Sequence, residues 1–354
     1  MESSGYVEVD LAALARNYAR LREAAEGAEV GAVVKANAYG LGLHAVAKHL
    51  LRRGCRTFFV ATLEEGRALR EALRESVIYV FEGAAAGREQ AFVDHVLRPV
   101  LNTPEQVRRW AESGPCALHV DTGINRLGMS VSEAEALAGS LAGARRSIEL
   151  VMTHLACADE PEHPLNSRQI EAFATVARRF PEARTSIGAS AGLYLGAAGR
   201  GVVVRAGIAL YGGNPFERRE SPVEPVASLW GKVLQLRDVE ADATVGYGAT
   251  HTAARGDRLA TIGVGYADGF QRRLGGRGCA SIGGVRVPIV GRISMDLLCL
   301  DVSALPREAI ALGQYVELFG RDIRVEEVAV LCDTISYEIL SGLGARLPRL
   351  YVEQ

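Results

Sequence analysis

The sequence contains very little lysine. Of its 40 basic residues only three are lysines, Lys35, Lys48 and Lys232, and the others are arginines. Arginine can replace lysine wherever only a surface charge is needed, but a guanidinium cannot serve as an amine nucleophile. Lys48 lies in a helical pattern and Lys232 in a strand pattern, where a solvated side chain is expected. Lys35 is therefore the candidate for a role that only an amine can fill.

The sequence also lacks long apolar runs. None reaches the ~18 residues of a membrane span, and the first residues, MESSGYVEVD, contain no apolar core of signal-peptide length. The six cysteines include no CxxC pair, which favours free thiols over disulfides. The net charge of −2 does not indicate a nucleic-acid or membrane-surface partner. We therefore expect a cytoplasmic protein that binds neither.

Short apolar runs alternate with helical patterns from about residue 28 to 210. The runs cover 30–34, 57–61, 77–81, 96–101, 116–121, 148–153, 184–189 and 201–207. This alternation is typical of a parallel sheet built from βα units. Eight runs favour closure into a (β/α)8 barrel over an open sheet. The first unit carries no GxGxxG motif, which weakens the dinucleotide-binding alternative.

The pattern changes after about residue 221. The segment NPFERRESPVEP is polar and contains prolines, and strand patterns separated by glycine turns follow it. We therefore predict an α/β plus β fold, with a TIM-like barrel over 11–221 and a mainly β C-terminal domain over 222–354. The strand pattern at 5–10 could join either domain, and we assign it to the β domain.

Lys35 directly follows an apolar run. Active sites of (β/α)8 barrels lie at the C-terminal ends of the strands, and partial burial there lowers the pKa of an amine, which favours Schiff-base chemistry. Arg126, His154, Ser190 and Arg205 also lie at or just after the ends of apolar runs. Alone, each of these residues can be structural. Together at one end of a barrel, they indicate a site for a phosphate dianion and a carboxylate.

Several motifs resemble those of alanine racemases, which are pyridoxal-phosphate enzymes. VVKANAYGLG (33–42) is similar to their cofactor-lysine motif. The other similar motifs, in order, are VDTGINRLG (120–128), THLACADEPEHPLN (153–166), RAGIALYG (205–212), VGYGAT (245–250), GVGYADGF (263–270), GRISMD (291–296), DTISYEILSGLG (333–344) and LPRLY (347–351). The resemblance covers nearly the whole chain. It implies the barrel and β domain predicted above, in a head-to-tail homodimer.

The resemblance also implies the catalytic residues. Lys35 would hold pyridoxal 5′-phosphate and act as one base, and Tyr247 of the partner subunit would act as the opposite base. Arg205 would face the pyridine nitrogen, and His154 would link Tyr247 to Arg205. Racemisation removes the α-proton on one face and returns it on the other, so two opposed bases perform it most directly. A tyrosine, with a reference pKa near ~10, needs electrostatic help to act as a base, and the His154–Arg205 network could supply it.

The binding residues follow from the same resemblance. Tyr39, Ser190, Tyr337 and the backbones of Gly207 and Ile208 would bind the phosphate. Arg126 and Met295 of the partner subunit would hold the substrate carboxylate, while Tyr266 and Met295 of the partner subunit would narrow the entrance. Arg292 and Asp296 would support this arrangement. The sequence indicates no metal site.

One position departs from the family pattern. Two residues before Asp121, many members have a lysine that is carbamylated and contacts the substrate-binding arginine, whereas this chain has His119. A histidine cannot carry a carbamate. Three alternatives follow: His119 forms a hydrogen bond nearby, an anion such as chloride fills the gap, or Arg126 is positioned otherwise. His119 could also be a packed strand residue.

The activity implied by the resemblance is interconversion of L- and D-alanine, supplying D-alanine for peptidoglycan. A serine or broad-specificity racemase is the nearest alternative. A decarboxylase of the same fold is disfavoured by the VGYG motif together with Arg205. A non-catalytic cofactor-binding protein is disfavoured by Tyr247, because such proteins usually lack the β domain.

Overall fold

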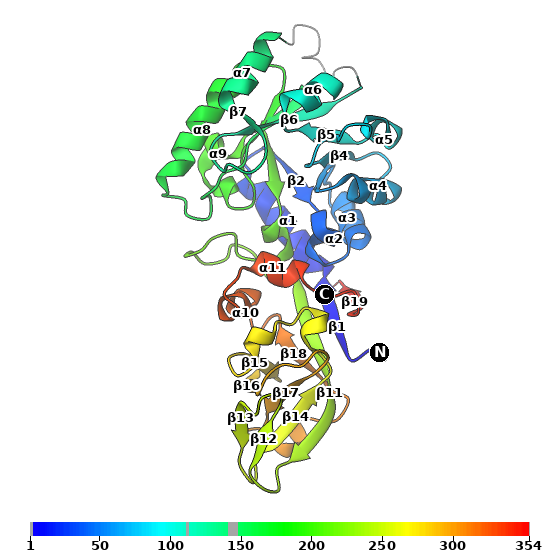
Figure 1. The fold of residues 1–354 in the computed structure, drawn as a ribbon, viewed down its shortest axis with the longest axis vertical. Coiled ribbons are helices and arrows are strands. Elements are labelled where there is room, and N and C mark those ends of the chain that lie inside the picture. Colours follow the sequence, from blue (N-terminus) through cyan, green and yellow to red (C-terminus); the bar gives the residue numbers. More distant parts are fainter. Residues whose placement is uncertain (1–2, 111–112, 141–147, 354) are drawn as a thin grey trace.

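The chain forms a barrel and a β domain that are arranged end to end, with both termini near the junction between them (Figure 1). The computed structural model describes residues 3–110, 113–140 and 148–353. The helices are α1 (Leu11–Ala24), α2 (Lys35–Tyr39), α3 (Leu43–Arg52), α4 (Leu63–Ala72), α5 (Glu89–Asp94), α6 (Pro104–Trp110), α7 (Val131–Ser140), α8 (Pro164–Ala177), α9 (Gly196–Arg200), α10 (Val325–Leu331) and α11 (Ser336–Ser341).

Eight parallel strands form the barrel wall, in the spatial order β10-β2-β3-β4-β5-β6-β8-β9. Their bounds are β2 (Glu29–Val33), β3 (Thr57–Val60), β4 (Val77–Val80), β5 (Arg98–Leu101), β6 (Cys116–Asp121), β8 (Ile148–Met152), β9 (Arg184–Ser186) and β10 (Val203–Ala206). A parallel bridge between Ala189 and Arg205 joins the two ends of this order. The short strand β7 (Met129–Ser130) pairs with β6.

The barrel strands coincide with the eight predicted apolar runs, which confirms the predicted fold class. Their sequences, such as VIYV in β4, are nearly continuously apolar because helices cover one face and the barrel interior the other. The last two strands are shorter than their runs. β9 ends at Ser186, and β10 begins only at Val203. Just before β10, Gly201 has a φ of 72° and forms an isolated antiparallel bridge with Ser186.

Local sequence sets where the first barrel helices begin. The Asp10 carboxylate accepts the backbone N–H of Ala13 at 2.9 Å and so caps α1. Thr62 and Glu65 form a reciprocal capping box at the start of α4. In Figure 1 the helices lie around the outside of the barrel strands. Because neighbouring barrel strands pair in parallel, they all end at the same end of the barrel.

The β domain is an eight-stranded sheet in the order β14-β17-β16-β15-β18-β11-β1-β19, and an added pairing of β14 with β11 curls it. The bounds are β1 (Gly5–Asp10), β11 (Ala227–Asp238), β14 (Arg258–Ile262), β15 (Cys279–Ile282), β16 (Val285–Val290), β17 (Leu298–Asp301), β18 (Tyr315–Phe319) and β19 (Arg349–Val352). A separate hairpin joins β12 (Ala243–Val245) to β13 (His251–Ala253). The N-terminal strand β1 pairs antiparallel with β11 and parallel with β19.

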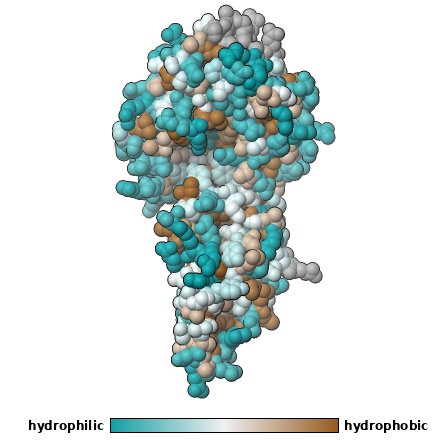
Figure 2. Space-filling model, in the orientation of Figure 1, coloured by the Kyte–Doolittle hydropathy of each residue, from teal (hydrophilic) through white to brown (hydrophobic). Residues whose placement is uncertain are grey.

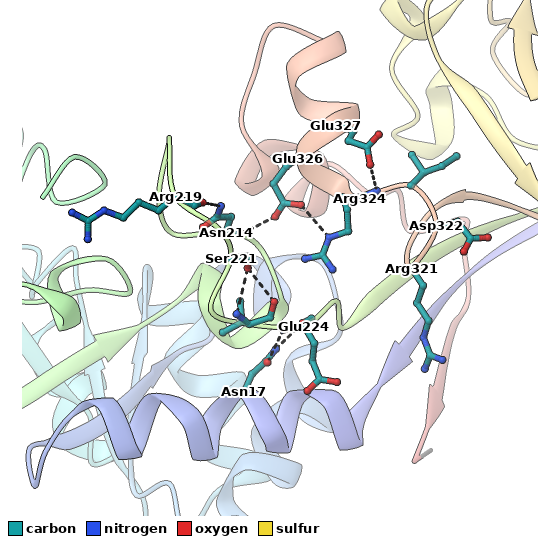
Figure 3. Close-up of polar contacts among 12 residues, drawn as sticks. Asn17, Asn214, Arg219, Ser221, Glu224, Arg321, Asp322, Arg324, Glu326 and Glu327 are labelled. Atoms are coloured by element: carbon teal, nitrogen blue, oxygen red, sulfur yellow. Dashed lines mark hydrogen bonds and ion pairs between the residues drawn. The ribbon is translucent and has the colours of Figure 1, made fainter. Parts of the chain in front are cut away.

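Side-chain hydrogen bonds fasten the segment between the barrel and the β domain (Figure 3). The Asn17 amide in α1 donates to the Glu224 carbonyl at 2.9 Å and accepts the Glu224 N–H at 3.0 Å. The Asn214 N–H donates to Glu326 at 2.6 Å, and Arg324 lies 3.6 Å from the same carboxylate. These contacts tie the connecting segment to both α1 and α10.

Element α2, which begins at Lys35, is not a right-handed helix but a left-handed turn without glycine. Ala36, Asn37, Ala38 and Tyr39 all have φ values between 51° and 55°. Each such residue costs about 1–2 kcal/mol in isolation. The turn packs closely against α11, because a Cβ on Gly40 would lie 2.3 Å from the Leu340 carbonyl oxygen. Strained backbone held by its surroundings is typical of functional sites.

The visible surface is mainly hydrophilic over the barrel, with hydrophobic residues scattered singly or in small groups (Figure 2). Within the described ranges, no helix is both long and apolar enough to cross a membrane. All six cysteines are free thiols, as the absence of CxxC pairs favoured.

Candidate active site

The predicted polar residues of the barrel gather at the C-terminal ends of its strands. Lys35 lies two residues beyond the end of β2, and His154 lies two residues beyond the end of β8. Arg205 is the next-to-last residue of β10. Arg126 lies in the loop after β6, and Ser190 follows β9. Because the strands are parallel and neighbouring, these side chains share one mouth of the barrel.

The Lys35 amine is half-buried at this mouth. Its nitrogen lies 5.9 Å from the centroid of the Phe81 ring, at the end of β4. Burial, followed by the charge of Arg126, lowers the pKa of Lys35, and Glu65 opposes this effect. A lowered pKa increases the fraction of neutral amine, which is the nucleophilic and basic form.

Glu65 is a site residue that the sequence analysis missed. One carboxylate oxygen accepts the Ala36 N–H at 2.6 Å, directly after Lys35, and the other accepts the Ala61 N–H at 2.7 Å. The capping pattern ThrxxGlu was visible in the sequence, but it predicts only a helix start. Glu65 thus fixes the left-handed turn that orients the Lys35 backbone.

Arg205 is buried in the barrel wall, and its guanidinium is held by several acceptors. One terminal nitrogen donates to the Ser186 hydroxyl at 2.5 Å. The other donates to the carbonyls of Thr153 at 2.6 Å and Ile187 at 3.2 Å. Burial lowers the pKa of Arg205 to about 9, which still leaves the guanidinium charged at neutral pH. The contacts fix the plane of the guanidinium. A group that faces it therefore receives a hydrogen bond, while the proton stays on Arg205.

His154 contacts Arg205 directly. Its Nδ1 lies 3.2 Å from a terminal nitrogen of Arg205. Because a guanidinium can only donate, Nδ1 accepts this hydrogen bond and the ring proton is on Nε2. Burial, followed by the charge of Arg205, lowers the pKa of His154 to about 3, so the ring is neutral. His154 therefore offers an Nε2–H donor on the side away from Arg205.

Backbone amides and Ser190 form a compact cradle after β9 and β10. The buried Ser190 hydroxyl oxygen accepts the N–H groups of Gly207 at 3.0 Å and Ala209 at 3.3 Å. The 3-10 helix η3 (Ile208–Tyr211) begins directly after Gly207. A Cβ on Gly207 would lie 2.5 Å from the Tyr39 hydroxyl, so glycine lets that hydroxyl approach the cradle. Because these two amides donate to its oxygen, the Ser190 hydroxyl keeps its own proton to donate to an oxyanion.

Two tyrosines extend the cradle. The Tyr39 and Tyr337 rings lie 6.1 Å apart between centroids, and Tyr39 stacks on Tyr211 at 4.7 Å. Burial, followed by the nearby Tyr337, raises the pKa of Tyr39. Burial, followed by Asp159, raises the pKa of Tyr337 to about 12. Both hydroxyls therefore stay protonated and can donate to an anion.

Asp121 organises the loop that carries Arg126. Its carboxylate accepts the N–H groups of Gly123 at 2.9 Å, Ile124 at 3.0 Å, Asn125 at 3.1 Å and Arg126 at 3.0 Å. Partial burial alone would raise the pKa of Asp121, but these four N–H groups lower it overall. The loop conformation is thus fixed at the end of β6, while the Arg126 side chain is exposed at the mouth.

His119 lies inside β6, beneath the Arg126 loop. Its Nδ1 lies 2.9 Å from the side-chain oxygen of Asn102, which the sequence analysis did not identify. Burial, followed by the charge of Arg205, lowers the pKa of His119 to about 4. The other ring nitrogen, Nε2, is buried and has no hydrogen-bond partner among the described residues.

The remaining predicted residues gather on the β domain of the same chain. The backbone N–H of Ala267, next to Tyr266, donates to the Met295 carbonyl at 2.9 Å. Asp296 pairs with Arg346 at 2.7 Å. Tyr266 is 42%, Met295 53% and Tyr247 71% exposed. These side chains are thus surface residues of a single chain.

Tyr247 lies in the loop of the β12–β13 hairpin, and this hairpin is at the end of the β domain far from the barrel (Figure 1). Arg292 packs beside this loop, because a Cβ on Gly248 would lie 2.7 Å from an Arg292 nitrogen. The single chain therefore brings Tyr247 and Arg292 together but does not bring them to Lys35.

The residues at the barrel mouth fit pyridoxal 5′-phosphate. An amine with a lowered pKa suits its aldehyde, and the Ser190 cradle, which leaves no room for a Cβ on Gly207, suits its phosphate. A charged donor, Arg205, suits its ring nitrogen. Among the described residues, no cluster of three His, Cys, Asp or Glu side chains could hold a metal ion.

Comparisons with known proteins agree with this geometry. The family model described as "Alanine racemase, N-terminal domain" matches residues 9–215, and "Alanine racemase, C-terminal domain" matches residues 226–351. An alanine racemase of Rhodospirillum rubrum is 46% identical over 359 residues, covering 99% of this chain and 96% of the relative. A catabolic alanine racemase of Rhizobium johnstonii is 45% identical over 358 residues, covering 99% of this chain and 95% of that relative.

A solved structure shares the whole architecture. The crystal structure of alanine racemase from Bartonella henselae, with covalently bound pyridoxal phosphate, superimposes with a TM-score of 0.93. The two sequences are 34% identical, and the match covers 99% of this chain and 100% of the Bartonella chain. The likeness therefore extends over both the barrel and the β domain.

Proposed function

The chain belongs to the alanine racemase family, and we propose that it moves the α-proton with two bases, Lys35 and Tyr247 of a second subunit. It is an amino-acid racemase that interconverts L- and D-alanine, and its cofactor is pyridoxal 5′-phosphate. One observation carries the proposal for the site. A half-buried amine with a lowered pKa shares the barrel mouth with a fixed guanidinium that contacts a neutral histidine.

The barrel mouth would hold the cofactor through residues of one chain. When bound, pyridoxal phosphate supplies an aldehyde that condenses with amines and a ring that withdraws electrons from the α-carbon. Lys35 would provide the amine, and Ser190, Tyr39, Tyr337 and the N–H groups after β10 would bind the phosphate. The left-handed turn and Glu65 keep the Lys35 backbone fixed, so that its amine has a defined position.

Arg205 would bind the ring nitrogen as a donor that keeps its proton. Its charge and its hydrogen bonds to three oxygen acceptors support this role. A ring nitrogen that accepts a hydrogen bond and is not protonated withdraws electrons less strongly. By keeping its own proton, Arg205 would therefore favour return of the α-proton to the substrate over transamination.

His154 would support the second base. Its Nδ1 accepts from Arg205, so its Nε2–H is free to donate toward a phenolic oxygen on the opposite face of the substrate. A donated hydrogen bond stabilises the phenolate form of a tyrosine. The charge of Arg205 adds to this stabilisation, because His154 links the two groups.

Tyr247 would come from a second copy of this chain. It is 71% exposed on the β domain, and a base with no contact to Lys35 in its own chain needs another subunit to reach that site. Tyr266 and Met295 are also exposed and lie together, which suits a shared surface that narrows the entrance. We therefore propose a homodimer in which each barrel mouth is closed by the β domain of the other subunit, with Arg292 and Asp296 supporting that surface.

Arg126 would bind the substrate carboxylate, together with the Met295 backbone of the second subunit. The Asp121 loop fixes where the Arg126 side chain begins, and the charge of Arg126 reaches both Lys35 and His154. We further propose that the protein works in the cytoplasm and supplies D-alanine for peptidoglycan. Its free thiols support the first of these proposals. One relative is named a catabolic alanine racemase, so a catabolic role is the alternative.

A single assay tests activity and specificity together. Purified holoenzyme is given L-alanine, D-alanine, L-serine or D-serine separately, and release of the opposite enantiomer is followed by chiral chromatography. We expect alanine to be racemised in both directions, and faster than serine. Equal or faster turnover of serine would indicate a broad-specificity racemase, and absence of alanine turnover in both directions would overturn the assignment.

A further inference from the structure

The hydrogen bonds around His119 fix which ring nitrogen carries the proton. The Asn102 amide nitrogen donates to the carbonyls of Phe81 at 2.9 Å and Val100 at 2.8 Å. Both amide protons are thus used, and the Asn102 oxygen faces His119 Nδ1 at 2.9 Å. Since that oxygen only accepts, Nδ1 carries the proton and Nε2 of the neutral ring carries a lone pair.

This lone pair is buried without a partner. His119 is only 7% exposed, and Nε2 has no hydrogen-bond donor among the described residues. A buried acceptor without a donor is costly and needs an explanation, such as a group that binds there. Because His119 Nε2 can only accept a hydrogen bond, its partner has to be a donor. A chloride ion at this nitrogen would face a lone pair and be repelled.

Arg126 lies on the loop next to this position, and its guanidinium forms no hydrogen bond with His119 in the structure. The loop folds directly over the imidazole, because a Cβ on Gly128 would lie 3.2 Å from His119 Cγ. Its backbone is fixed by the Asp121 carboxylate, and the Arg126 charge is close enough to lower the pKa of His119. Arg205, the other nearby guanidinium, is fixed by Ser186 and Thr153 and forms no hydrogen bond with His119 Nε2.

We propose that His119 is a positioning residue whose Nε2 accepts a hydrogen bond from the Arg126 guanidinium and directs it toward the substrate carboxylate. This inference rests on the proposed function, in which Arg126 binds that carboxylate. Of the alternatives that the sequence left open, a hydrogen bond of His119 is thus favoured over a bound anion such as chloride. Asn102 acts behind His119 by holding the required tautomer.

Steady-state kinetics of His119→Leu test the proposal. We expect KM for alanine to rise about tenfold with kcat changed less than about twofold, because the lost hydrogen bond orients a binding group and not a base. His49→Leu is the matched control, since His49 is also a buried histidine but lies in α3. Its KM should stay at the wild-type value. An unchanged KM in His119→Leu would overturn the proposal.

A double variant separates this proposal from the proposed function. In the Arg126→Ala background, His119→Leu should raise KM no further, because the guanidinium that it orients is gone. If Arg126→Ala itself leaves KM unchanged, the assignment of Arg126 to the carboxylate fails. If Arg126→Ala raises KM and His119→Leu multiplies that effect independently, only the present inference fails.

Two further measurements test the proposal on the wild-type holoenzyme, so they need no variant. In ¹⁵N-histidine spectra, His119 should show a protonated Nδ1 and an unprotonated Nε2 at pH 7.5, and the opposite tautomer or a doubly protonated ring would contradict the proposal. In kinetics at constant ionic strength, replacing methanesulfonate by chloride should leave KM unchanged. A severalfold decrease of KM with chloride would indicate an anion site instead.

Discussion

The Nδ1 atom of His154 lies 3.2 Å from a terminal nitrogen of Arg205. The guanidinium is the donor, so the histidine is held as the tautomer with a proton on Nε2. One contact thus joins the group proposed to face the ring nitrogen to the group proposed to support the second base.

Replacing His154 should move the alkaline behaviour of the enzyme. In His154→Leu the Nε2–H donor is lost, the phenolate form of the second base is less stable, and the rate at neutral pH should fall about tenfold. For the enantiomer whose α-proton the tyrosine removes, the rise of kcat/KM with pH should move to higher pH, because the phenolate forms later. The exposed His44→Leu serves as the control, with an unchanged profile. A profile of His154→Leu that overlays the wild type would rule out this support.

Arg205→Glu should change the balance of products. A carboxyl group can share a proton with the ring nitrogen, which makes the ring a stronger electron sink and lengthens the life of the substrate carbanion. We expect slower racemisation and measurable pyruvate from transamination, detected with lactate dehydrogenase. Pure racemisation by the variant, without pyruvate, would argue against the proposed role of Arg205.

Gly207→Ala should weaken cofactor binding. The added Cβ would lie 2.5 Å from the Tyr39 hydroxyl and displace it from the phosphate cradle. We expect the dissociation constant of pyridoxal phosphate, measured by absorbance titration of the apoenzyme, to rise at least about tenfold. Gly139→Ala is the control, because a Cβ there meets no atom within 4 Å. Equal affinity in both variants would contradict the cradle.

His119 should make folding less stable in mild acid. Its pKa is lowered from 6.5 to about 4, so between these values the unfolded chain binds a proton that the native protein does not. The stability contributed by neutral His119 is full above pH 6.5 and is lost as pH falls toward 4. Between pH 6.5 and pH 5 this loss amounts to about 2 kcal/mol.

Urea unfolding of the holoenzyme at several pH values checks this contribution. His119→Leu should lose less free energy of unfolding between pH 7 and pH 5 than the wild type, because leucine does not titrate. Other lowered groups, such as His154, remain in both proteins and cancel in the difference. The same pH dependence in both proteins would show that His119 is not held neutral.

The sequence predicted the barrel well because its strands are buried on both faces. Such strands appear as short apolar runs, and all eight runs became barrel strands. Lys35 could also be identified from the sequence, because lysine is scarce and Lys35 directly follows an apolar run. The polar residues at the other strand ends followed from the same geometry.

Other features could not be predicted because they depend on contacts distant in sequence. Glu65 lies 29 residues from Ala36, and Asn102 lies 17 residues from His119, so neither pairing follows from local pattern. The left-handed turn at 36–39 contains no glycine and contradicts local preference. It forms where α11 packs against Gly40, a contact between segments some 300 residues apart.

The central claim is that Lys35 and Tyr247 from different subunits form one site. Mixing Lys35→Ala and Tyr247→Phe proteins, each inactive alone, tests it most directly. Random exchange of subunits gives heterodimers with one intact site, so activity should recover to about a quarter of the wild-type value. Activity that stays at the background of the single variants, with subunit exchange demonstrated by differently tagged chains, would contradict the shared site.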